Sequence, residues 1–307
     1  MAVLERSDTA ERVVLFARHL VGRSRLTHLR LAEPSVSAEH ATLSWDGRGW
    51  ELHDLDSRNG TTLDGRRLAP GERAPVSRGG VIGFGSAGPR FRLVDDAPPT
   101  ALALPQDGGP PIVAEHDLLA LPGADAPEVT AYRNAAGEWV LERDGAAERT
   151  ADGREVSAGG RRFVLHLPDV VAPTWDAAAV APALDHVALR LSVSRDEEFV
   201  SATVLIGART IDLGARAHHA LLLALARARL DEQRLEALLP ETSQGWVYLD
   251  DLTRDLGLDE MHLNVAVYRC RQQVAGAGVA GAAGVIERRK PTRQLRLGVA
   301  RVEVVML

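Results

Sequence analysis

The chain has 307 residues, of which 45% are hydrophobic and 25% charged, with a formal net charge of −6. These values are ordinary for a cytoplasmic globular protein of two or three domains. They exclude a transmembrane helix, because no run approaches the roughly 18 consecutive apolar residues that one needs. The single cysteine, Cys270, excludes an internal disulfide and a cysteine-rich metal site.

Residues 1–96 carry short alternating runs, such as 41–45 and 50–54, separated by Gly, Asp or Asn. This spacing is typical of an all-β sandwich or barrel. Asp46-Gly47 and Asp64-Gly65 are the dipeptides that favour tight hairpin turns. The first block is therefore predicted to be an all-β sandwich.

Three motifs of the first block combine residues that suit phosphate binding. Arginine supplies a fixed charge and a forked donor, and a hydroxyl with backbone amides completes an anion cradle. An asparagine beside a glycine in a tight turn binds the main chain of an extended peptide. The motifs are Gly22-Arg23, Ser37-Ala38-Glu39-His40 and Ser57-Arg58-Asn59-Gly60-Thr61.

In this order and spacing the motifs resemble those of the forkhead-associated (FHA) domain, a phosphothreonine-binding sandwich. The resemblance implies that Arg23 and Ser37 bind the phosphate and that Asn59 binds the peptide backbone. It implies that Arg58 flanks the phosphate or the residues after it. Ala38 stands where the family often has a basic or polar residue, which predicts weaker binding or shifted selectivity. The alternative is that these are only turn residues. The residues implied to support the site structurally are Gly22, His40, Gly60 and Thr61.

Two Pro-rich segments, 97–110 and 169–184, are predicted to be linkers, and residues 111–168 between them form a predicted β module. The module shows echoes of the first block but no counterparts of its phosphate-binding residues. It is interpreted as a degenerate FHA-like copy without phosphate affinity, and the alternative is an unrelated β module. The echoes pair Trp139 with Trp50, Asp152-Gly153 with Asp64-Gly65, and Phe163 with Phe91.

Residues 185–307 are predicted to be an α+β winged-helix domain. Asp259 is a candidate N-cap of the third helix, which runs to about Val274. The pattern resembles the effector domain of OmpR-type bacterial regulators, which implies that this third helix reads DNA. The other expected elements are strands over 187–193, 200–206 and 209–213, helices over 215–230 and 246–256, and a hairpin of 285–289 with 294–297.

The spacing of the third helix predicts two faces. Four apolar residues share one face and are expected to pack into the core, whereas Asn264, Tyr268, Arg271 and Gln272 are expected to point away. Between positions 261 and 301 there are eight Lys or Arg and one acidic residue. The residues expected to contact DNA are Tyr268, Arg269, Arg271, Gln272, Arg288, Arg289, Lys290 and Arg293. The acidic second helix opposes this hypothesis, and a solvated face or a protein-binding winged helix are the alternatives.

No Walker-type loop, zinc-binding histidine pair or nucleophile elbow is present in the sequence, so no enzyme, cofactor or metal is predicted. The prediction is a phosphothreonine-responsive transcriptional regulator downstream of a Ser/Thr kinase. Its expected partners are a phosphothreonine-containing protein and DNA. The alternative is an adaptor in kinase signalling or secretion control whose winged helix binds a protein.

Overall fold

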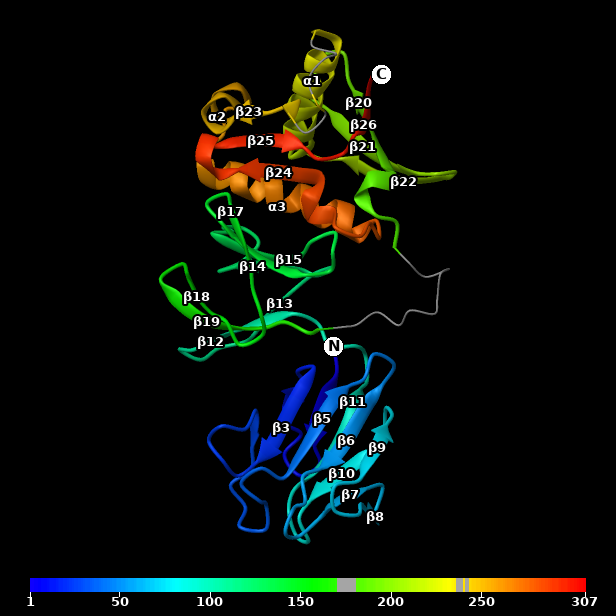
Figure 1. The fold of residues 1–307 in the computed structure, drawn as a ribbon, viewed down its shortest axis with the longest axis vertical. Coiled ribbons are helices and arrows are strands. Elements are labelled where there is room, and N and C mark those ends of the chain that lie inside the picture. Colours follow the sequence, from blue (N-terminus) through cyan, green and yellow to red (C-terminus); the bar gives the residue numbers. More distant parts are fainter. Residues whose placement is uncertain (170–180, 236–239, 241–242) are drawn as a thin grey trace. The chain divides into compact units, whose positions relative to one another are not determined.

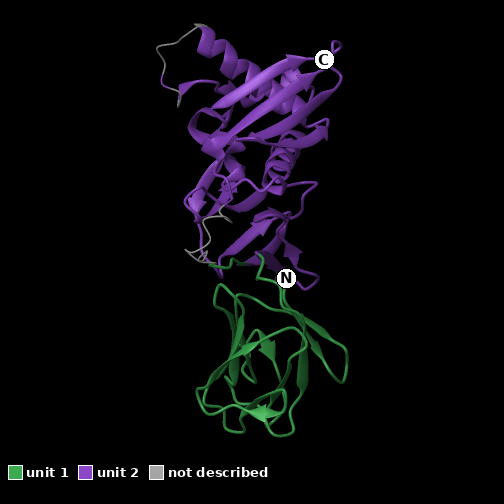
Figure 2. Cartoon of the chain, turned by 90° about the vertical axis from the view of Figure 1, so that its right-hand side faces the viewer, with its two compact units in different colours: residues 1–100, 166–177 green, residues 101–165, 178–307 purple. Residues whose placement is uncertain are grey.

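The computed structural model of the protein describes residues 1–169, 181–235, 240 and 243–307. It divides into two compact units (Figure 2). Residues 1–100 belong to the first unit, and residues 101–165 group with the described residues from 181 onward in the second. Within the described residues no helix is long and apolar enough to cross a membrane.

The first unit contains a sandwich of two sheets, with strand orders β2-β1-β11-β10-β7-β8 and β4-β3-β5-β6-β9. Alternation along the strands makes the core, as on β6, where Trp50, Leu52 and Asp54 are buried and the residues between them are not. The strands are β1 (Val3–Arg6), β2 (Arg12–Val14), β3 (Arg18–Gly22), β4 (Leu29–Arg30), β5 (Ala41–Trp45), β6 (Trp50–Asp54), β7 (Thr61–Leu63), β8 (Arg66–Arg67), β9 (Arg73–Val76), β10 (Val81–Phe84) and β11 (Arg90–Asp95).

The second unit begins with a block of two four-stranded sheets, which we call the middle block (residues 101–165). Their strand orders are β13-β12-β19-β18 and β14-β15-β16-β17. Strand β12 lies inside the segment that was predicted to be a linker. The strands are β12 (Leu102–Pro105), β13 (Ile112–Val113), β14 (Leu118–Leu121), β15 (Val129–Arg133), β16 (Trp139–Arg143), β17 (Ala146–Arg149), β18 (Glu155–Ala158) and β19 (Arg161–His166).

The strand orders of the middle block repeat those of the first unit. The order β13-β12-β19-β18 corresponds to β2-β1-β11-β10, and β14-β15-β16-β17 corresponds to β3-β5-β6-β9. Two of the sequence echoes fall on equivalent strands, because Trp139 begins β16 as Trp50 begins β6, and Phe163 lies on β19 as Phe91 lies on β11.

The third pair of similar segments, the two Asp-Gly dipeptides, lies in connections that are not equivalent. Asp152-Gly153 lies between β17 and β18, whereas Asp64-Gly65 joins β7 to β8. The middle block has no strands equivalent to β7 and β8, because Asp144-Gly145 connects β16 directly to β17. The similarity between these two Asp-Gly turns is therefore a similarity of local turn chemistry alone.

The rest of the second unit combines a sheet of order β22-β21-β20-β26, helices α1 to α3, and a small sheet of order β23-β25-β24 (Figure 1). Strands β20, β21 and β25 have the bounds that alternation predicted, and β26 was not predicted. The elements are β20 (Val187–Val193), β21 (Val200–Ile206), β22 (Arg209–Ala215), α1 (His219–Leu235), β23 (Val247–Tyr248), α2 (Leu249–Leu256), α3 (Glu260–Gly276), β24 (Ile286–Arg289), β25 (Gln294–Leu297) and β26 (Arg301–Met306), with short 3-10 turns at Leu184–His186, Ala282–Val285 and Lys290–Thr292.

Helix α3 begins where the sequence predicted. The Asp259 carboxylate accepts a hydrogen bond from the His262 backbone N–H at 2.8 Å, which satisfies one of the free donors of the first turn. The predicted core face is confirmed, since its four side chains are at most 2% exposed and join the largest apolar cluster of the unit. These side chains are Leu263, Val267, Cys270 and Val274.

Candidate functional site

Three loops of the first unit meet at one end of the sandwich, and backbone hydrogen bonds hold them together. They are the connections β3–β4, β4–β5 and β6–β7. Arg23 follows β3, and its N–H donates to the Ser37 carbonyl at 2.9 Å. The Arg58 N–H, from the third loop, donates to the Ser37 hydroxyl oxygen at 3.1 Å. The predicted phosphate-binding residues are thus gathered around Ser37, and both arginines are exposed to solvent.

Gly22 permits the first two loops to approach this closely. A β-carbon at this position would lie 2.3 Å from the carbonyl oxygen of Ala38, a contact that real side chains do not make. The Ser24 N–H donates to the same oxygen at 3.0 Å. Ala38 itself points no polar side chain into the site, but its backbone helps to join the loops.

His40 braces the loop that carries Ser37. It is fully buried, its Nδ1 accepts from the Ser37 N–H at 3.1 Å, and its Nε2 faces the Gly60 carbonyl at 3.3 Å. This pattern requires the neutral tautomer with the proton on Nε2. Burial lowers the pKa of His40 below its usual value, although the hydrogen bond to Gly60 opposes the shift. A neutral imidazole therefore ties the second loop to the third.

The buried side chain of Asp54 fixes the third loop by hydrogen bonds, and this residue is not among those predicted from the sequence. Its carboxylate accepts from the Ser57 hydroxyl at 2.7 Å, the Ser57 N–H at 3.0 Å and the Thr61 hydroxyl at 2.5 Å. Burial acts to raise the pKa of Asp54, but these hydrogen bonds outweigh it and lower the pKa. An acidic residue three positions before a serine in a loop is the available sequence signal, since such pairs form local side-chain turns.

Asn59 belongs to the third loop and connects it to the second. Its side-chain N–H donates to the Ser35 carbonyl at 2.8 Å. In the described part of the chain no donor reaches its side-chain oxygen, which is the group that can accept a peptide N–H. Gly60 follows with a φ of +79°, in the left-handed region where a side chain would be strained. Its carbonyl also accepts from the Gly85 N–H at 2.9 Å, which anchors the turn to the neighbouring sheet.

The arrangement has the chemistry of an anion site with a peptide-ordering group beside it. Because the Ser37 oxygen accepts from Arg58, its hydroxyl proton is left to donate to an anion. Arg23 uses Nε to hold the Val36 carbonyl at 3.3 Å, which fixes the guanidinium and leaves its terminal N–H groups for a ligand. Two exposed guanidinium groups and a hydroxyl donor suit a phosphate dianion.

The residues that were predicted to contact DNA are divided by the structure into a covered and an exposed set. Tyr268 and Arg271 were expected to face outward, which is wrong, because their exposures are 4% and 2%. The middle block packs on this face, where Leu118 and Ala120 of β14 join a buried apolar cluster with Tyr268. A polar helix face was thus correctly located, but its covering partner lies over a hundred residues away in the sequence.

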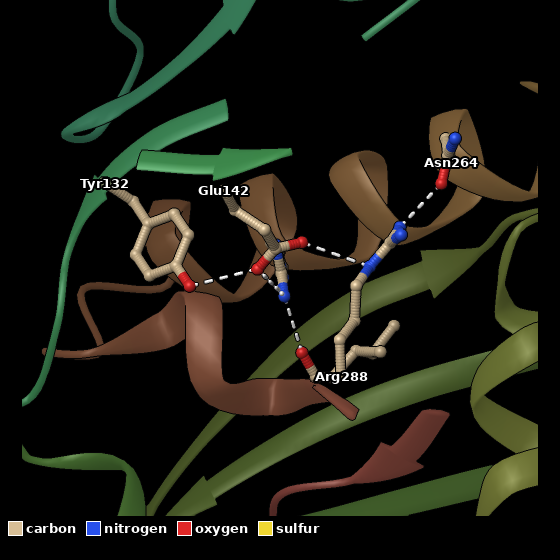
Figure 3. A network of polar contacts seen from close by, with 6 residues as sticks. Tyr132, Glu142, Asn264 and Arg288 are labelled. Atoms are coloured by element: carbon tan, nitrogen blue, oxygen red, sulfur yellow. Dashed lines mark hydrogen bonds and ion pairs between the residues drawn. The ribbon is translucent and has the colours of Figure 1, made fainter. Parts of the chain in front are cut away.

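A buried ionic network fixes the covered set (Figure 3). The Glu142 carboxylate accepts two hydrogen bonds from the Arg271 guanidinium, each at 3.1 Å, and one from the Tyr132 hydroxyl at 3.0 Å. Arg288 forms an ion pair with the same carboxylate at 3.1 Å and donates to the Asn264 side-chain oxygen at 2.7 Å. Because both guanidinium groups are largely buried and paired with Glu142, Arg271 and Arg288 are not available to a duplex in this arrangement.

The remaining candidates lie at the edge of that interface or outside it. Arg269 pairs with Asp125 at 3.2 Å, and Gln272 donates to Glu115. The exposed candidates are Arg289, whose guanidinium stacks 4.1 Å from the Trp246 ring centre, Lys290, and Arg293, which pairs with Glu260 at 3.2 Å.

Comparison with known proteins identifies residues 19–85 of the first unit. Residues 19–85 match the FHA domain family. The FHA domain-containing protein FhaB of Mycobacterium tuberculosis is 35% identical over 77 residues, which make up 25% of this chain and 50% of FhaB, so the chain spans about half the length of this curated relative.

Two solved structures are each similar to 32% of the chain. An FHA domain studied for its phosphothreonine-dependent interactions is 28% identical, with 32% of this chain and 99% of that chain covered and a TM-score of 0.28. Mycobacterium tuberculosis EmbR in complex with a low-affinity phosphopeptide is 21% identical, with 32% and 25% covered and a TM-score of 0.29. From the family match, residues 19–85 form an FHA domain, a module that binds phosphothreonine peptides in signalling.

Proposed function

We propose that this protein reads phosphothreonine on a partner protein, and that a Ser/Thr kinase acting on that partner supplies the signal. The observation that carries the proposal is the hydrogen-bonded junction of three loops around Ser37, which presents Arg23 and Arg58 to solvent. Arg23 and Ser37 hold the phosphate, and Arg58 flanks it. Asn59 uses its side-chain oxygen to fix the backbone of the peptide beside it.

Binding of a matched pair of peptides tests this function. A phosphothreonine peptide selected from a library should bind, and its unphosphorylated twin should not. Each charge-assisted contact is worth about 1.5–3 kcal/mol, so Arg23→Ala should weaken binding at least about tenfold. Arg48 is the matched control, because it is an exposed arginine on the β5–β6 hairpin at the other end of the strands.

Calorimetry with the full chain reads out both variants. Arg48→Ala should bind like the unmodified protein. If no peptide of the library binds, or if Arg23→Ala binds as tightly as Arg48→Ala, the assignment of the site is refuted.

We further propose that the middle block is an FHA-like sandwich without a phosphopeptide site. The support is the repeated strand order, together with two shortened connections. The segment equivalent to the β6–β7 loop is reduced to the Asp144-Gly145 turn, so nothing corresponds to Asn59. The segment equivalent to the Arg23 and Ser37 loops is the short connection 122–128. Arg23→Ala in the full chain should therefore leave no second class of phosphopeptide site.

DNA binding by residues 185–307, as in OmpR-type regulators, is a second candidate function. Arg289, Lys290 and Arg293 support it, because they are exposed around the β24–β25 hairpin. The burial of Tyr268 and Arg271 opposes it for as long as the middle block covers α3. If the cover never leaves, the α3 face stays closed to a duplex, and the alternative is an adaptor in kinase signalling or secretion control in which residues 185–307 bind a protein through a surface other than α3.

A further inference from the structure

Three polar contacts join the middle block to α3, and in each of them the middle block contributes a carboxylate. Glu115, Asp125 and Glu142 of the middle block each contact a basic or amide side chain that belongs to α3. Glu128 and Asp144 line the same small cavity as Arg271 and Arg288. The middle-block side chains at these positions are thus acidic, and the basic side chains that they face are Arg269, Arg271 and Arg288. The partners on α3 are Gln272, Arg269 and Arg271, with Arg288 of β24 joining at Glu142.

The centre of this interface differs from its edge in burial. The Glu142 side chain is 6% exposed, that of Arg271 2% and that of Arg288 13%, whereas Asp125 at the edge is 95% exposed. Burial acts to raise the pKa of Glu142, but the two guanidinium groups outweigh it and lower the pKa. Removing the Glu142 carboxylate would leave two guanidinium groups without a counter-charge in a buried site. The packing of the middle block on α3 therefore depends on Glu142 far more than on Asp125.

The covered side chains have the chemistry that reads and holds a duplex. Arginine, asparagine and glutamine contact base edges in the major groove, and arginines neutralise phosphates. We propose that the middle block is an intramolecular cover of the α3 face, whose carboxylates occupy the places of nucleic-acid phosphates and must leave before the face binds duplex DNA. This inference rests on the second candidate function above and is independent of the phosphopeptide site.

Full-length Glu142→Ala and Glu142→Gln test the cover, with Asp125→Ala as the matched control that removes one exposed carboxylate. Hydroxyl-radical footprinting of Tyr268, which is 4% exposed, reports whether the face is covered. Binding of a random-sequence duplex at low salt reports whether the face binds DNA. Glu142→Gln keeps the shape of the side chain, so it serves if the alanine variant does not fold. Unchanged phosphopeptide affinity confirms that the first unit is intact.

The expected result is that Glu142→Ala raises the oxidation of Tyr268 and tightens duplex binding at least about tenfold, because Arg271 and Arg288 become available to phosphates. Adding Arg271→Ala should reverse most of this gain, and Asp125→Ala should change neither readout by more than about twofold.

Three outcomes would overturn the inference, each in a distinguishable way. If Tyr268 becomes reactive but duplex affinity does not change, the uncovered face does not bind DNA and the DNA candidate falls with the inference. If unmodified protein already binds the duplex through Arg271, DNA binding stands but the cover does not oppose it. If both Glu142 variants leave Tyr268 protected and duplex affinity unchanged, Glu142 does not hold the cover in place.

Discussion

Asp54 shows how one buried side chain positions exposed ones. It lies at the end of β6 on the inward face, where alternation would place an apolar residue. Its carboxylate accepts two hydrogen bonds from Ser57 in the loop that follows and one from Thr61 at the start of β7. That loop carries Arg58 and Asn59. The three hydrogen bonds offset the cost of burying this carboxylate, and they order the loop that presents the two side chains.

We expect Asp54→Asn to lower the free energy of unfolding by about 1–3 kcal/mol, because one carboxylate acceptor is replaced by an amide donor that faces the Ser57 N–H. The phosphopeptide affinity should fall with it. Asp56→Asn is the control, since Asp56 is exposed and its φ of +56° suits asparagine. Denaturant titration and calorimetry measure both effects, and equal stability of the two variants would contradict this role of Asp54.

Two buried imidazoles should make the first unit sensitive to acid. Burial and the neighbouring imidazoles, including His28, lower the pKa of His19 to about 3, and burial lowers that of His40. Below the ordinary histidine pKa, the two imidazoles bind protons in the unfolded chain but not in the native protein. Stability is therefore complete above the unfolded pKa and is lost as pH falls toward the folded pKa, by at most about 1.4 kcal/mol per pH unit for each group.

Thermal unfolding between about pH 7.5 and about pH 5 checks this expectation, because the window includes the ordinary histidine pKa of about 6.5. His19→Asn should flatten the pH dependence of stability, because asparagine does not titrate. The asparagine oxygen can replace Nδ1 as the acceptor of the Phe16 N–H, which lies 3.3 Å from Nδ1. A variant that is as acid-sensitive as the unmodified protein would show that His19 is not responsible.

At the scale of elements, the site depends on how closely strand β3 and the β4–β5 loop approach. We expect Gly22→Ala to separate them, because the added carbon meets backbone and not a flexible side chain. Stability should fall by about 1–3 kcal/mol, and phosphopeptide binding should weaken. Gly49→Ala is the control, with no atom within 4 Å of the added carbon, so loss of binding in both variants would indicate a general effect of alanine.

Elements were predictable where the residues that determine them are neighbours in the sequence. Strand β20, the Asp259 cap and the core face of α3 depend on alternation, on one hydrogen bond and on helical spacing. Val247–Tyr248 was predicted as helix but pairs with Leu295 and Gln294, which are 46 or more positions away. The motif residues of the candidate phosphopeptide site were recognisable in the sequence, whereas Asp54 was not, because its only signal is a serine three positions later, a pairing that is common in turns.

At the scale of the molecule, the two units have separate apolar cores. We therefore expect two calorimetric transitions, of which only the first unit's should respond to a phosphopeptide. A peptide at about 100 times its dissociation constant should add about 2.7 kcal/mol to the free energy of unfolding of that unit. Asp54→Asn identifies the transition by lowering it. A single transition that shifts as a whole would show that the units unfold together.

The parallel pairing of β26 with β20 limits self-association of the protein through the edge of β20. Strand β20 holds Val187, Leu189 and Leu191 in its buried row, and β26 occupies the edge that would otherwise present its free backbone groups. Seven-residue strands of this kind template intermolecular sheets when their edges are open. β26 replaces that edge with one bearing Arg301 and Glu303, charges that discourage further strand addition. Chains lacking residues 301–306 should accordingly self-associate through β20, a liability that light scattering would register as growth of large particles during refolding.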